Sequence, residues 1–107
     1  MPPGWRSDDG SVTSRQRATV FVRGDVQGVG FRWWARARAL ELGLSGHARN
    51  LADGRVEVVA QGSDAALARF IELLEEKPST TGRPGTVTGL VTQQGTARPD
   101  LAGFVEK

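Results

Sequence analysis

Three glycines, at positions 24, 28 and 30, mark a junction between two hydrophobic patterns of different period. The preceding run, residues 18–23, is apolar and β-branched enough to predict a strand. The following run, residues 31–42, predicts an amphipathic helix. Its apolar stripe consists of Phe31, Ala35, Ala39 and Leu42. Because glycine tolerates positive φ, such a junction turns main-chain N–H groups inward, beside the free N–H groups of the helix start. The sequence therefore predicts a strand, an anion-binding loop and a helix.

The remaining patterns extend this unit with two strands, a second helix and further strands. Residues 45–51 and 55–62 predict strands separated by an Asp-Gly hairpin signal. Ser63 is a suitable N-cap for the second helix. Residues 86–93 predict a fourth strand, and a short fifth is expected around Phe104. This order predicts an α+β, ferredoxin-like (split βαβ) two-layer sandwich, with an antiparallel sheet of four to five strands and two helices on one face.

Length and composition limit the chemistry. The 107 residues fit one domain, which we place at residues 17–107, after a polar, patternless and therefore flexible tail over residues 1–16. With no cysteine and one histidine, His47, thiolate chemistry is excluded, and a metal site or a Ser-His-Asp triad is disfavoured. No apolar run reaches the roughly 18 residues of a membrane span, and the N-terminus does not read as a secretory signal, so we expect a cytoplasmic protein without a membrane partner.

The basic composition favours an anionic ligand but does not indicate the size of that ligand. The formal net charge is +2, and twelve of the fourteen basic residues are arginines spread along the chain. Arg32 follows the glycine loop directly, and its guanidinium fork suits phosphate oxygens. The loop does not match a P-loop, because Gly30 is followed by Phe31-Arg32, nor a dinucleotide fingerprint, because Trp33 replaces the third glycine. The alternative to a phosphate-binding loop is an ordinary glycine turn in which Arg32 only covers part of the protein surface.

The run from Gly24 to Arg32, GDVQGVGFR, resembles the signature of the acylphosphatase family. A second family motif, a glycine with an asparagine four residues on and then a glycine and a strand, is similar to the run from Gly46 to Asn50 followed by Gly54. The resemblance covers roughly residues 17–94. It implies a hydrolase acting on acid anhydrides (acylphosphatase, EC 3.6.1.7), which cleaves the carboxyl–phosphate bond of acyl phosphates without a cofactor or metal.

The same resemblance assigns roles to individual residues. Arg32 would bind the phosphoryl oxygens, and Asn50 would orient the attacking water. The main chain of the loop would bind the substrate phosphate through Gly24, Asp25, Val26, Gln27, Gly28, Val29, Gly30 and Phe31. The implied partners are a small acyl phosphate and the product inorganic phosphate, and we expect a monomer that binds no nucleic acid. Taken alone, Asn50 would be read as a turn former.

Four features depart from the family pattern or stay open. His47 occupies a position that the family gives to an aromatic residue, and we expect it to be a partly buried strand residue. The connection over residues 79–85 is looser than usual, and Glu106 stands where an apolar residue is expected, so the last strand should be short. Of the adjacent tryptophans 33 and 34, we expect one to be buried and the other to be half exposed.

Two other functions are compatible with this fold. A nucleic-acid-binding module would need aromatic residues on the open sheet face, where the sequence offers little besides Phe21, and clustered arginines, which it does not show. An acylphosphatase-like domain that is inactive, or that serves carbamoyl transfer, would be part of a longer chain with zinc motifs. Because this chain ends at Lys107, we expect a stand-alone enzyme.

Overall fold

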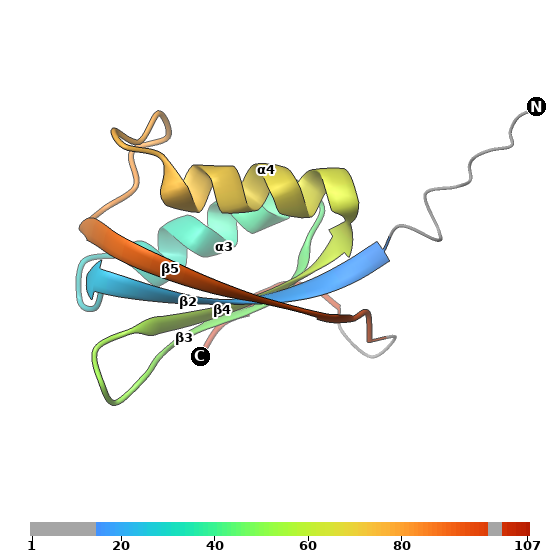
Figure 1. The fold of residues 1–107 in the computed structure, drawn as a ribbon, viewed down its shortest axis with the longest axis horizontal. Coiled ribbons are helices and arrows are strands. Elements are labelled where there is room, and N and C mark those ends of the chain that lie inside the picture. Colours follow the sequence, from blue (N-terminus) through green and yellow to red (C-terminus); the bar gives the residue numbers. More distant parts are fainter. Residues whose placement is uncertain (1–14, 99–101) are drawn as a thin grey trace, which may run out of the picture.

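The computed structural model describes residues 15–98 and 102–107, and its elements follow the predicted order (Figure 1). The elements are β2 (Arg15–Asp25), α3 (Phe31–Glu41), β3 (Ser45–Asn50), β4 (Val56–Ser63), α4 (Asp64–Glu75), β5 (Thr86–Thr96) and β6 (Phe104–Glu106). The predicted ferredoxin-like α+β class is confirmed.

The five strands form one sheet in the order β5-β2-β4-β3-β6. The central strand β4 is antiparallel to both β2 and β3, and β5 is antiparallel to β2. At the other edge, β6 runs parallel to β3, with His47 opposite Val105. The prediction of an antiparallel sheet is therefore wrong at this edge, and the sheet is mixed. β5 and β6 lie at opposite edges of the sheet, so they do not form a hairpin. The two strands of a hairpin must be antiparallel, whereas a strand that crosses to the other edge can pair with its neighbour in a parallel direction.

The first strand begins earlier than predicted. Arg15 pairs with Ser63, and Gln16 pairs with both Gly62 and Thr96. The prediction of a tail over residues 1–16 is thus wrong for Arg15 and Gln16, which belong to β2. Both side chains are polar, so the alternating pattern of apolar residues did not extend the predicted strand to them. Residues 1–14 lie outside the described residues.

Both helices cover the same face of the sheet, as Figure 1 shows, and the core lies between these layers. Helix α3 buries Phe31 and Trp34, and α4 buries Phe70, which contacts Phe104 of β6 edge-on with ring centroids 6.5 Å apart. Ser63 caps α4 as predicted, because its side-chain oxygen accepts a hydrogen bond from the Ala66 N–H at 3.2 Å. Within the described ranges, no helix is long and apolar enough to cross a membrane.

Candidate active site

The glycine loop, residues 24–30, comprises the last two residues of β2, Gly24 and Asp25, which still pair with β5, and the segment that leads from them to the start of α3. Gly30 is the N-cap of α3 with φ 91°, and Gly28 has φ 73°, both in the left-handed region that favours glycine. No side chain caps the helix, so the first-turn N–H groups are not occupied by a side-chain acceptor and add a partial positive charge. Val26 is buried and anchors the loop, while its glycines are exposed. The predicted positive φ at these glycines is confirmed.

The side chain of Gln27 fixes this loop to the next hairpin. Its Nε2 donates hydrogen bonds to the carbonyl oxygens of Leu51 at 2.7 Å and Arg55 at 2.9 Å. The Leu51 N–H in turn donates to the Arg55 carbonyl at 2.8 Å, which closes the hairpin. The loop is therefore bound directly to the segment that follows Asn50.

Gly85, in the connection that precedes β5, is a second residue that supports the glycine loop. A Cβ built on Gly85 would lie 2.1 Å from the carbonyl oxygen of Asp25, so this residue packs its main chain directly against the loop. Its φ of 78° also favours glycine. Sequence reasoning missed both Gly85 and the Gln27 side chain. The Pro84-Gly85 pair is a turn signal that draws attention to this position, whereas nothing local identifies the partners of Gln27.

Arg32 lies in the first turn of α3, half-buried, with its guanidinium beside the end of β6. Its Nη1 donates a hydrogen bond to the main-chain oxygen of Lys107 at 2.5 Å. The Lys107 N–H donates to the carbonyl of Ala48 in β3 at 2.8 Å. This chain of hydrogen bonds holds the guanidinium next to β3, two residues before Asn50.

Asn50 is the last residue of β3, and its side chain is exposed. Because β2 and β3 are both antiparallel to β4, they run parallel to each other, and the segments that follow them meet at the same end of the sheet. Within the described ranges, no protein group hydrogen-bonds to the Asn50 amide. The structure thus brings the loop, Arg32 and Asn50 to one end of the sheet, and leaves the amide available to a ligand or water.

The neighbouring aromatic and histidine residues fill structural positions. Trp34 is buried and its Nε1–H donates to Thr81, whereas Trp33 is 62% exposed. His47 is half-buried on β3, and its Nε2 lies 3.3 Å from the Glu57 carboxylate. Burial raises the pKa of Glu57, but hydrogen bonds from Arg49 and His47 outweigh that effect and leave the pKa below its ordinary value. His47 therefore lies in a half-buried side-chain cluster with Glu57 and Arg49, as expected of a partly buried strand residue.

Two carboxylates, those of Asp25 and Asp53, also lie at this end of the sheet. Asp25 is an exposed carboxylate within the loop itself. A hydrogen bond from the Arg55 N–H, reinforced by the Arg55 side chain, lowers the pKa of Asp53. Among the described residues, no group of three or more His, Cys, Asp or Glu side chains is arranged to hold a metal ion. The groups at this end that suit a phosphate include main-chain N–H groups, the Arg32 guanidinium and the Asn50 amide.

Fold and site together define a ferredoxin-like α+β domain with a glycine loop, an arginine and an asparagine at one end of its sheet. The family model for acylphosphatase matches residues 18–105. The acylphosphatase of Acidothermus cellulolyticus is 54% identical over 98 residues, which cover 92% of each chain. The chain belongs to the acylphosphatase family, whose members are hydrolases.

Solved structures agree with this assignment. An acylphosphatase from Coxiella burnetii superposes with a TM-score of 0.78 at 30% identity, covering 91% of this chain and 97% of that one. A similar domain occurs within a longer protein, T. kodakarensis HypF, with a TM-score of 0.66 at 29% identity. That match covers 86% of this chain but 12% of HypF. Similarity over nearly the whole length is therefore found with the acylphosphatases rather than with the longer protein.

Proposed function

We propose that this acylphosphatase hydrolyses small acyl phosphates with Arg32 and the glycine loop binding the phosphoryl group and Asn50 orienting the water. The observation that carries the proposal is the convergence of these three features at one end of the sheet, held there by Gln27 and by the Arg32–Lys107 hydrogen bond. Main-chain N–H groups of residues 24–31 and the guanidinium supply donors for the equatorial phosphoryl oxygens, where charge accumulates in phosphoryl transfer.

The reaction follows from these positions. The Asn50 amide accepts a hydrogen bond from a water molecule and aims its oxygen at phosphorus. As the oxygen–phosphorus bond forms, the bond between phosphorus and the carboxyl oxygen breaks, and the carboxylate leaves with that electron pair. The proton of the water passes to a phosphoryl oxygen of the substrate, which removes the need for a protein base. The products are a carboxylate and inorganic phosphate, and the enzyme acts by positioning and by charge stabilisation.

The two side chains have separable roles, which kinetics can distinguish. Arg32→Ala should weaken inhibition by phosphate and lower kcat, and Arg32→Lys should restore little because a point charge lacks the fork geometry. Asn50→Ala should lower kcat on the order of 10²–10³-fold, the usual cost of one positioned group, with a nearly unchanged inhibition constant for phosphate. Both constants are measured for each folded variant with benzoyl phosphate in the presence of EDTA. Near-normal kcat in Asn50→Ala, normal phosphate binding in Arg32→Ala, or loss of wild-type activity in EDTA would refute these assignments.

We further propose that the enzyme is a cytoplasmic monomer that acts on small molecules and not on nucleic acid. On the open face of the sheet, the Phe21 ring is covered by the Arg55 guanidinium, 5.0 Å from its centroid, so it is not free to stack on a base. Size-exclusion chromatography with light scattering tests the monomer, and a dimer would refute it.

A further inference from the structure

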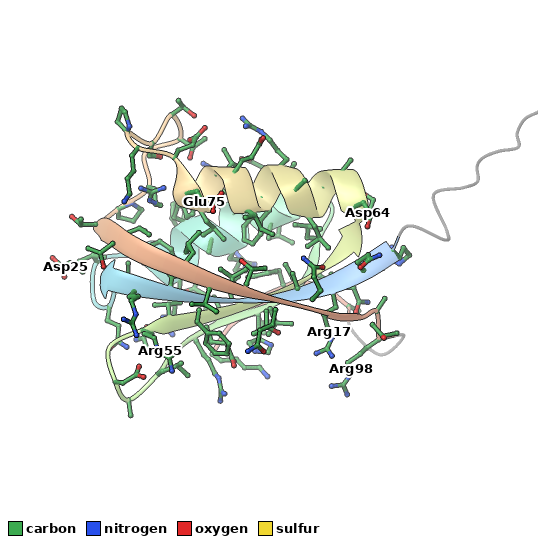
Figure 2. The ribbon with its side chains drawn as sticks, in the orientation of Figure 1. Arg17, Asp25, Arg55, Asp64, Glu75 and Arg98 are labelled. Carbon is green, nitrogen blue, oxygen red and sulfur yellow. The ribbon has the colours of Figure 1, made fainter. Side chains whose placement is uncertain are left out.

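A hollow of about 310 Å³ adjoins the glycine loop at the end of β2. Its lining consists of Arg23, Gly24, Asp53, Gly54 and Arg55. Gly24 also begins the loop, and the Arg55 carbonyl accepts the hydrogen bond from Gln27. Figure 2 places Arg55 at the same end of the sheet as Asp25. The hollow is therefore next to the loop, although none of the groups assigned to the reaction's phosphate, beyond Gly24, line it.

Arg55 is held rigidly in this hollow. Its Nε donates to Asp53 Oδ2 at 2.8 Å, and its main-chain N–H donates to Asp53 Oδ1 at 3.1 Å. The ring of Phe21 lies against the other side of the guanidinium. One carboxylate thus balances the charge of Arg55, and the remaining N–H groups of its fork have a fixed direction.

Arg23 is the uncompensated charge of the hollow. It is exposed, and within the described parts of the chain its guanidinium has no hydrogen bond or ion pair. Val22 pairs with Val56, so Arg23 and Arg55 are the next residues outward on adjacent strands. The aliphatic part of the Arg23 side chain lies across Gly89, which has no side chain to obstruct it. Its Cγ and Cδ are each 3.6 Å from the position of a Cβ built on Gly89. Two neighbouring guanidinium groups with one carboxylate leave a net positive charge in the hollow.

We propose that this hollow binds a carboxylate at the far end of the acyl group, while the phosphoryl group occupies the glycine loop. The inference rests on the proposed function and narrows its substrate class to acyl phosphates of dicarboxylic acids. Gly24 is shared by the loop and the hollow, so the two sites adjoin and one substrate can extend from one into the other. The planar fork of Arg23 matches a carboxylate, and Arg55 adds a second fixed donor set.

A matched pair of substrates tests the proposal. Succinyl phosphate and butyryl phosphate have the same four-carbon chain, and differ by a carboxylate in place of the terminal methyl group. We expect the wild-type enzyme to have a kcat/KM for succinyl phosphate about fivefold higher than for butyryl phosphate, as for an exposed but bidentate ion pair. Arg23→Gln should abolish this preference, and Arg23→Lys should retain part of it.

Arg15→Gln is the matched control, because it removes one positive charge from the opposite end of the same strand. This variant should keep the wild-type preference between the two substrates. No preference in the wild type, or an equal loss in Arg15→Gln and Arg23→Gln, would overturn the inference while leaving the proposed function intact. Failure of the wild type to hydrolyse either substrate would refute the proposed function and the inference with it.

Discussion

Replacing Gln27 with methionine removes both hydrogen bonds that tie the glycine loop to the hairpin after Asn50, while keeping the length of the side chain. A net contribution of about 0.5–1.5 kcal/mol for each hydrogen bond predicts a loss of about 1–3 kcal/mol in the free energy of unfolding. The value should fall in the lower half of this range, because each carbonyl retains a hairpin partner. The Leu51 oxygen still accepts from the Gly54 N–H at 3.2 Å, and the Arg55 oxygen still accepts from the Leu51 N–H.

The same change should affect turnover more than binding. The loop and Arg32 remain on one side of the lost contact and Asn50 on the other, so the phosphate keeps its donors but the water loses its alignment. A small misplacement of this kind costs up to about 10²-fold in rate, and we expect kcat to fall at least tenfold with a nearly unchanged phosphate inhibition constant. Urea unfolding gives the stability, with a midpoint shift of roughly 1 M, and steady-state kinetics give the two constants.

Gln93→Met on β5 is the control for this experiment. Gln93 is exposed and has no side-chain hydrogen bond in the described part of the chain, so neither stability nor turnover should change appreciably. If Gln27→Met is destabilised as expected but keeps its kcat, Gln27 supports the fold only and does not position the reaction. If neither quantity changes, the two hydrogen bonds contribute nothing in solution.

Two other changes test the surroundings of the site. Gly85→Ala would place a Cβ 2.1 Å from the Asp25 carbonyl oxygen, so it should lower the free energy of unfolding in urea by about 1–3 kcal/mol and weaken inhibition by phosphate. Gly82→Ala is the control, because Gly82 has a similar φ but open space around it, and it should cost less. Equal costs for the two variants would contradict the close approach of Gly85 to the loop. Glu57→Gln should destabilise the protein at pH 7, because ion pairing lowers the pKa of Glu57 in the folded state. The difference in stability between Glu57→Gln and the wild type should shrink as the pH falls below 4.5, the ordinary pKa of a glutamate carboxyl. A difference that stays constant from pH 7 to 3 would contradict the pairing.

Much of the fold follows from local patterns. Alternating burial along β2, the stripe of α3 and the Ser63 cap depend on periods and side-chain chemistry that act within a few residues, whereas the central strand β4 is buried on both faces over residues 58–62. The glycine loop is predictable for the same reason, because positive φ at Gly28 and Gly30 is a property of the residue type. The position of Arg32 directly after the glycine loop already suggests a phosphate ligand, with a plain glycine turn as the alternative. The role of Asn50 is suggested only by the resemblance to a family, since an asparagine before a hairpin is not specific alone.

Other features depend on segments far apart in the sequence. The partners of Gln27 lie 24 and 28 residues away, and the oxygen that accepts from Arg32 lies 75 residues away. The direction of β6 depends on which edge of the finished sheet is still open, and the juxtaposition of Arg23 with Arg55 depends on the register between β2 and β4. The helices and strands and the backbone conformation of the glycine loop follow from the sequence, because they depend on short-range geometry. Which carbonyl, carboxylate or guanidinium each side chain contacts becomes visible in the folded chain alone, because these contacts depend on how the finished layers pack.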